Sequence, residues 1–169
     1  MKYLLLSFLF TGFLFINGCS SKSADDYMNA AQQNIKQKNI SEAISNYESV
    51  IHEFPNSPQA PDALFQIATI YQNKMMKNIS DVESYRKAEE TFRLVYNKYP
   101  DTKKAPMALF LSGFILANDL RNFKGATSTY NLFLEKYPEH ELASSAKEEL
   151  SNMGLSPDQI LQKKAQKNI

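Results

Sequence analysis

The sequence predicts an all-α protein, an α-solenoid of antiparallel helix pairs with a capping helix at its C-terminal end. Strand-favouring residues are scarce, since the 169 residues include three Val and no Trp, whereas Ala, Leu, Lys, Glu and Gln are plentiful. The seven Pro lie between candidate helices or within their first turns, where proline is tolerated. A segment of the chain also recurs along the sequence, which is typical of stacked helical units.

The first eighteen residues form a candidate export signal. Lys2 supplies a positive charge, and Leu4–Ile16 is an uncharged run of apolar and small residues. A helix over that run covers roughly 20 Å, which is shorter than the roughly 30 Å hydrocarbon core of a bilayer. We therefore interpret residues 1–18 as a signal peptide rather than as a membrane-spanning helix.

The end of this signal contains the single cysteine of the chain. Ile16-Asn17-Gly18-Cys19 resembles the lipobox of bacterial lipoproteins, with an aliphatic residue three before Cys19 and a small residue directly before it. The resemblance implies that Cys19 becomes the mature N-terminus and carries covalent lipid, which leaves residues 19–24 as a tether. Ser20, by analogy with Gram-negative sorting, favours the periplasmic face of the outer membrane. The alternative is an ordinary cleaved signal that ends in a cysteine by chance.

Residues 25–153 carry the repeat. The segment Pro55–Phe65 matches Pro100–Phe110 at six of eleven positions, and a third copy from Pro138 keeps Ala143 and Ala146 at the same offsets. A second motif lies upstream of Pro55, Pro100 and Pro138. In each case an Ala is followed four positions later by an aromatic residue. These pairs are Ala43/Tyr47, Ala88/Phe92 and Ala126/Tyr130.

These motifs resemble the tetratricopeptide repeat (TPR), a helix–turn–helix unit with small residues where its helices touch and Pro after the second helix. The resemblance implies units over residues 25–56, 57–101 and 102–139. Ala68 and Gly113 are expected to face Ala88 and Ala126 across the two helices of their units. The aromatic residue before each Pro is biased away from the α region, so each second helix is expected to stop there.

The C-terminal region is expected to close the stack. Residues 140–153 are predicted to form a lone first helix that covers the open end, with Gly154 directly after it as the stop signal. Ser156, Pro157 and Gln159 have the pattern of a helix start. Residues 154–169 are therefore predicted to be a short, solvated terminal helix or tail.

The linker gives a narrower resemblance over Asp25–Met153. Its pattern of Pro, Asn or Asp, Ser or Thr, two variable residues and Ala-Pro-x-Ala-Leu-Phe is similar to the BamD-type lipoproteins of the outer-membrane β-barrel assembly machinery. It is equally similar to the C-terminal TPR domain of the periplasmic cell-division coordinator of the Tol-Pal system. Three units and a cap are fewer than the five units of the former, and the coiled-coil segment of the latter is missing. The first resemblance implies a role in outer-membrane protein assembly or envelope maintenance, and the second implies a role like that of the Tol-Pal coordinator. A third hypothesis is an accessory subunit of a secreted enzyme or a solute-binding module.

Composition and motifs argue against other classes of function. The chain has 19 basic and 18 acidic residues, and removal of Lys2 with the signal leaves 18 of each, so no nucleic-acid partner is expected. Neither His52 nor His140 has a second His four residues on, and glycine-rich phosphate loops are missing. We therefore expect no enzymatic activity, no metal, no cofactor apart from the lipid and no small-molecule substrate. The expected partners are proteins of the cell envelope.

One candidate binding surface follows from the TPR geometry, in which first helices line the concave side. Tyr27, Leu64 and Leu109 are the equivalent large apolar residues of the three first helices. Helical spacing from these positions predicts an apolar stripe on the concave side. Its members are Met28, Phe65, Met107, Phe110 and Phe114. The hypothesis is that this stripe receives a segment of a protein partner, and the equal alternative is that these side chains are ordinary core.

A second candidate surface lies in the second unit. Tyr27 and Pro55 are 28 residues apart, whereas the equivalent Leu64 and Pro100 are 36 apart, so this unit has eight additional residues. They fall within Gln72–Asp81, where nothing breaks a helix, so two additional projecting turns are one prediction. Met75, Met76 and Ile79 would then form a partner or membrane-surface contact. The alternative is a longer loop that packs back on the domain.

Overall fold

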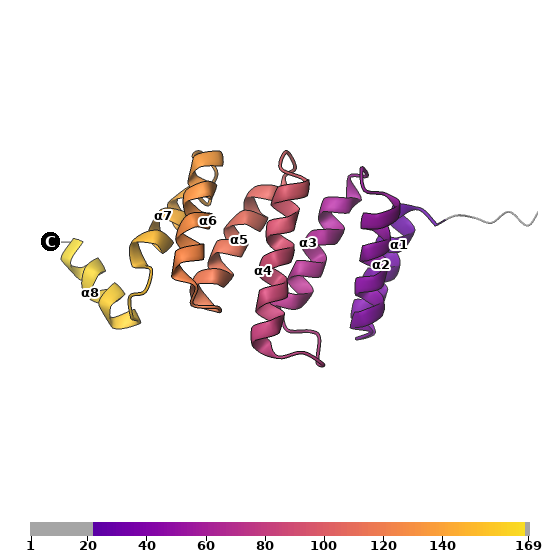
Figure 1. Cartoon of the computed structure of the whole chain (residues 1–169), viewed down its shortest axis with the longest axis horizontal. Helices are drawn as coiled ribbons and strands as arrows, with labels where there is room; N and C mark the ends of the chain where they lie inside the picture. Colours follow the sequence, from indigo (N-terminus) through magenta and orange to yellow (C-terminus); the bar gives the residue numbers. More distant parts are fainter. Residues whose placement is uncertain (1–21, 168–169) are drawn as a thin grey trace, which may run out of the picture.

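The computed structural model describes residues 22–167, and over that range the chain forms eight helices in one row (Figure 1). The signal peptide and Cys19 lie outside the described residues. The helices are α1 (Ala24–Lys36), α2 (Ile40–Glu53), α3 (Gln59–Gln72), α4 (Asp81–Lys98), α5 (Lys104–Asn118), α6 (Phe123–Lys136), α7 (Ala143–Asn152) and α8 (Pro157–Lys167).

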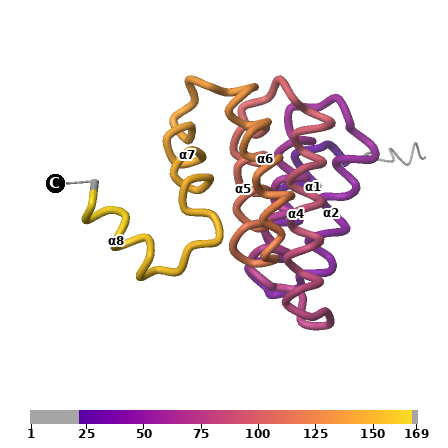
Figure 2. Tube along the Cα trace, turned by 60° about the vertical axis from the view of Figure 1, so that its left-hand side comes forward, coloured from indigo at the N-terminus to yellow at the C-terminus, as the bar shows by residue number. Residues whose placement is uncertain are grey.

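Successive helices pack as antiparallel pairs in two layers. Each of the first six helices contacts the next one along the chain, and α1 contacts α3 as α3 contacts α5. The helices α1, α3 and α5 therefore form one layer, and α2, α4 and α6 form the other. The helix α7 covers the end of the stack, and α8 extends away from it (Figure 2). The predicted solenoid with a C-terminal capping helix is confirmed.

The core consists of three clusters, and each cluster joins neighbouring units. The first cluster combines α1 and α2 with Ile67 and Ile70 of α3. The central cluster packs Phe92 of α4 with residues of α3 and α5. The third cluster packs Tyr130 and Phe133 of α6 with α5 and α7. Since every cluster crosses a unit boundary, no unit shields its apolar side alone.

Small residues allow the paired helices to approach closely. Ala68 and Ala88 are both fully buried in the central cluster. A Cβ atom added to Gly113 would lie 3.0 Å from Cε1 of Tyr130, so α5 has no room there for a larger residue. The prediction that Gly113 lies at the contact between paired helices is confirmed, although the atoms closest to it belong to Tyr130 rather than to Ala126.

The turns between units share one conformation. Phe54, Tyr99 and Tyr137 have φ between −129° and −132° and ψ between 51° and 54°, and α2, α4 and α6 end directly before them. The third turn keeps the hydrogen bonds of the second although its sequence has diverged. His140 N donates to Tyr137 O at 3.2 Å, as Thr102 N donates to Tyr99 O at 3.2 Å. The predicted helix stops are confirmed.

The C-terminal helix boundaries follow the predicted signals. Gly154 has a φ of 77° and follows the end of α7, which ends at Asn152. Ser156 and Gln159 form a reciprocal cap at the start of α8, with Gln159 N donating to Ser156 Oγ at 3.3 Å and Ser156 N donating to Gln159 Oε1 at 2.8 Å.

The additional residues of the second unit lengthen both the loop and the second helix. The helix α4 has 18 residues, whereas α2 and α6 have 14 each, so about one additional helical turn forms at the start of α4. The remaining additional residues lie in the loop, so the prediction of two projecting turns is only partly right. The helix α3 ends at Gln72, and α4 begins at Asp81. Lys74 has a φ of 52°, a left-handed conformation that ends α3. Its Nζ atom lies 3.0 Å from Oδ2 of Asp81, which closes the loop at its base.

Candidate protein-binding surface

The structure places the predicted stripe on the layer of first helices. Met28 lies on α1, Phe65 on α3, and the remaining three residues, Met107, Phe110 and Phe114, lie on α5. All five side chains are half-buried. Half-burial means that each side chain has one part in contact with the protein and another part accessible to solvent.

Phe65 belongs largely to the core. Its ring centroid lies 5.1 Å from that of Phe92 in an edge-to-face arrangement. Lys104 Nζ lies 4.9 Å from the same ring centroid and 3.2 Å from Oδ1 of Asp62. The Lys104 ammonium therefore covers part of the Phe65 ring, which leaves less apolar surface for a partner.

Met28 and Phe110 also contribute to the core. Met28 packs against the first cluster. The ring centroid of Phe110 lies 5.5 Å from that of Tyr130 and 5.9 Å from that of Phe133. For these two residues and Phe65, the core alternative therefore accounts for the buried part of the side chain.

Met107 and Phe114 differ from the other three residues. They are seven residues apart on one face of α5, and neither belongs to any of the three clusters in the described part of the chain. Leu111, which lies between them, packs against the central cluster. Apolar residues thus continue around α5 beyond the face that the core requires, and this face is the best-supported binding surface.

The second candidate surface is largely part of the core. Met75 and Met76 are half-buried and pack against the first cluster. Ile79 is half-buried in the same loop. The loop therefore presents less free apolar surface than a projecting helix would.

Charged groups hold this loop in place. Hydrogen bonding to Asp81 raises the pKa of Lys74, whose Nζ atom also lies 5.6 Å from the ring centroid of Tyr85. Burial raises the pKa of Asp119 at the end of α5, whereas a hydrogen bond from Tyr85 and the charge of Lys74 act in the opposite direction. Interactions among Lys74, Asp81, Tyr85 and Asp119 thus connect the loop, α4 and α5. The spacing of these residues in the sequence did not indicate this arrangement.

A buried carboxylate between α4 and α5 is a further feature that sequence reasoning missed. Glu89 is only 5% exposed, and its Oε1 atom accepts a hydrogen bond from Ser112 Oγ at 3.0 Å. Arg93 Nε lies 3.5 Å from the same oxygen. The i,i+4 spacing of Glu89 and Arg93 resembles an exposed helix pair, so nothing in the sequence indicated burial.

The residues considered for catalysis have structural surroundings. His140 Nδ1 accepts a hydrogen bond from Leu142 N at 3.1 Å, and its ring packs edge-on against Phe133. Within residues 22–167, no three His, Cys, Asp or Glu side chains are grouped so that they could hold a metal ion. In the same range, no helix has both the length and the apolar character that a bilayer crossing requires.

A row of TPR-type helix pairs, with an apolar face on its first-helix layer, defines the protein as a helical repeat scaffold. The chain belongs to the YfiO family of outer membrane lipoproteins, whose family profile matches residues 20–154. These are BamD-like, non-catalytic lipoproteins, so family membership confirms the predicted resemblance, the outer-membrane location and the absence of enzymatic activity. No curated protein gives a significant match to the chain.

Proposed function

We propose that the protein is a lipid-anchored scaffold that captures protein partners in the periplasm during outer-membrane protein assembly. The family of outer membrane lipoproteins supports this role over that of a Tol-Pal coordinator. Membership of a lipoprotein family supports lipid attachment at Cys19, the single cysteine of the chain.

The apolar face of α5 carries the proposal. Met107 and Phe114 are partly exposed although the core does not require them there. A large aromatic side chain in such a position is typical of an interface anchor, because its burial by a partner removes apolar surface from water at little conformational cost. Phe110, which is half-buried, lies between them on α5.

The chemistry of the surrounding surface indicates what kind of partner segment fits. Lys104 and Asp62 form an ion pair near the start of α5, and Asn118 lies at its end. The face is therefore apolar in the middle and polar at both ends. This arrangement suits a partner segment with one or two large apolar side chains flanked by polar residues.

Phe114→Asp in the full-length chain tests this surface. Phe114 is outside the core clusters, so we expect a folded protein whose retention of a barrel insertase falls by about tenfold or more. Crosslinking in membranes followed by affinity capture measures the retention, and a circular dichroism melt checks folding. Phe110→Asp is a less useful variant because Phe110 contacts Tyr130 and Phe133.

Leu94→Asp is the matched control. Leu94 is 38% exposed on α4, in the other layer of helices, so its substitution adds the same charge away from the proposed surface.

Three outcomes would contradict the proposal. Equal partner retention by the Phe114→Asp variant and the wild-type protein would contradict the binding surface. Capture of Pal or of septal peptidoglycan synthases in place of the insertase would contradict the assembly role. Retained lipid labelling in Cys19→Ala would contradict the anchor.

A further inference from the structure

A pocket of about 750 Å³ lies between the α2–α3 turn and the α4–α5 turn. Its wall is formed mainly by prolines and Tyr99, and its rim carries Lys98, Lys103 and Lys104. Asp62 is the one carboxylate that lines it, and Asp62 is paired with Lys104 at 3.2 Å. Lys98 and Lys103 are exposed, and neither has an ion-pair partner among the described residues. The pocket therefore has a local excess of positive charge.

Other groups at the pocket also favour an anion. Thr102 and the backbone of the two turns complete the wall beside the lysines. The helices α3 and α5 both begin at this pocket, and neither has a side-chain cap on its first turn. The positive ends of two helix dipoles thus add to the charge of the lysines. Proline and tyrosine surfaces beside these donors match a ligand with an anionic group next to apolar chain.

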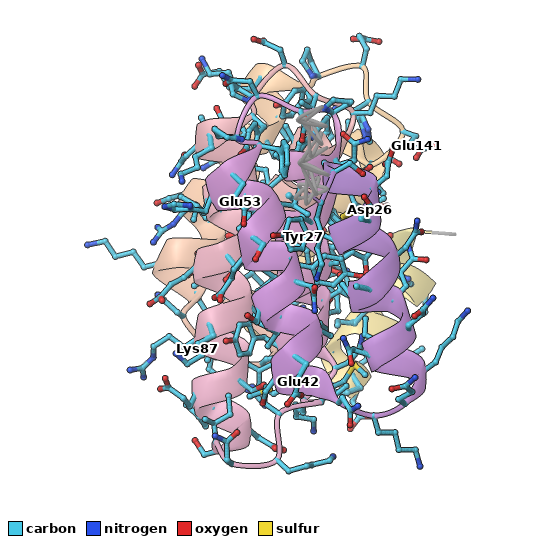
Figure 3. The ribbon with its side chains drawn as sticks, turned by 90° about the vertical axis from the view of Figure 1, so that its right-hand side faces the viewer. Asp26, Tyr27, Glu42, Glu53, Lys87 and Glu141 are labelled. Atoms are coloured by element: carbon cyan, nitrogen blue, oxygen red, sulfur yellow. The ribbon has the colours of Figure 1, made fainter. Side chains whose placement is uncertain are left out.

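The short tether keeps the start of α1 close to the lipid anchor. Ala24 is five positions after Cys19, so an extended chain spans at most about 18 Å between them. The helices α1 and α3 start at the same end of the stack, because Gln59 Nε2 donates to Asp25 Oδ1 at 2.8 Å. In Figure 3, Asp26 and Glu53 lie toward this end, whereas Glu42 and Lys87 lie toward the other.

We propose that this end of the stack docks on the lipid surface and that the pocket binds the phosphate of a phospholipid headgroup. The inference rests on the lipid anchor of the proposed function, which holds the start of α1 close to the bilayer. The lysines of the pocket neutralise the headgroup phosphate. Asp25 and Asp26 lie at the same end but outside the lining of the pocket, where Asp25 accepts a hydrogen bond from Gln59 and Asp26 caps α1 through Ser23.

Docking at this end has a consequence for the loop at residues 73–80. The loop joins the end of α3 to the start of α4, so it lies at the opposite end of the stack. Met75, Met76 and Ile79 then lie at the end of the stack that is distant from the bilayer. Of the two contacts predicted for them, a partner contact fits this orientation and a membrane-surface contact does not.

The test is lysine acetylation of the full-length lipidated protein, followed by mass spectrometry. The protein is compared in vesicles of phosphatidylethanolamine and phosphatidylglycerol and in maltoside micelles, which contain no phosphate. We expect Lys98, Lys103 and Lys104 to react about fivefold or more slowly in the vesicles. Lys38 and Lys124, which lie at the opposite end of the stack, are expected to react equally in both.

Charge-neutralised variants test whether the pocket itself binds the membrane surface. In Lys98→Gln/Lys103→Gln, Lys104 is expected to lose its protection in vesicles. In the control Lys38→Gln/Lys124→Gln, which removes the same charge at the other end, Lys104 is expected to keep it.

The outcomes separate this inference from the anchor on which it rests. A chain that floats with vesicles but shows no protection of Lys98 and Lys103 overturns the docking alone. A chain that does not float with vesicles overturns the lipid anchor and the docking with it. Equal protection by inorganic phosphate in micelles overturns the assignment to a lipid headgroup, because a soluble anion would then suffice.

Discussion

Tyr130 is fully buried between α5 and α6, yet its hydroxyl has no hydrogen-bond partner in the described part of the chain. The ring lies directly against Gly113 and packs with Phe110. Burial raises the pKa of the hydroxyl above its ordinary value of 10.0, and the negative charge of Glu149 raises it further. The protein thus uses the size of this aromatic ring, whereas the hydroxyl is desolvated without compensation.

Tyr130→Phe is therefore expected to increase the free energy of unfolding by about 1 kcal/mol, because it removes an unpaired buried polar group. The gain is expected to be larger above pH 10. There the unfolded chain releases the phenolic proton more readily than the folded protein, so wild-type stability falls as pH rises.

Urea unfolding near neutral pH and above pH 10 measures both effects. Tyr71→Phe is the control, because Tyr71 is only half-buried. A Tyr130→Phe protein less stable than wild type would show that the hydroxyl has a partner.

The stripe residues show how far single residues could be predicted from the sequence. Helical spacing placed Phe110 and Phe114 together on the first-helix layer, and this was correct. Spacing did not reveal that Phe110 packs on α6 whereas Phe114 lies outside the clusters. That difference depends on how closely the neighbouring helices approach each position, which is a property of tertiary packing.

At the scale of elements, the turns inside the units have a common feature that the sequence did not indicate. The helices α1, α3 and α5 end near a residue with left-handed backbone conformation, and none of the three is a glycine. They are Lys38, Lys74 and Arg121, with φ of 65°, 52° and 53°. Because Lys and Arg are not signals for this conformation, the sequence could not decide between a longer helix and a loop after Tyr71.

Arg121→Gly is expected to increase the free energy of unfolding by about 0.5–1 kcal/mol. Glycine removes the steric cost of the left-handed conformation, and the greater entropy of the unfolded chain offsets part of that gain. Lys74→Gly is expected to gain less, because it also removes the Lys74–Asp81 ion pair. Thermal unfolding of the two variants measures the difference, and destabilisation by Arg121→Gly would contradict the strain argument.

At the scale of the whole molecule, stability comes from clusters that cross unit boundaries, and α8 has little part in them. Ile160 is half-buried, but Leu161 is 66% exposed. The helix is connected to α7 by an ion pair of Lys164 with Glu148 at 2.8 Å and by hydrogen bonds from Lys163 to Ser151 and Asn152. Exposed polar contacts of this kind contribute little to folding.

Removal of residues 156–169 is therefore expected to change the free energy of unfolding by less than about 1 kcal/mol. Removal of residues 141–169 also deletes α7 and exposes the third cluster, so it is expected to cost several times more. Urea unfolding followed by circular dichroism compares the two truncated proteins with the full chain. Equal losses for both truncations would show that α8 is part of the core.

The overall architecture could be predicted because the repeat specifies it several times. Small residues at the helix contacts, the aromatic–Pro stops and the closing helix all indicated the same stack, and the structure has it. The binding surface could be predicted only as a set of candidate positions. Repeat scaffolds share the residues that stack their helices, whereas the residues that select a partner depend on the partner.

The shared conformation of Phe54, Tyr99 and Tyr137 makes the three junctions geometrically interchangeable. A duplicated copy of residues 57–101 inserted after Asp101 would find at both of its borders a joint that the chain already makes. A gene that gains or loses one such unit can therefore change the length of the protein, because the added or remaining units form the same core contacts.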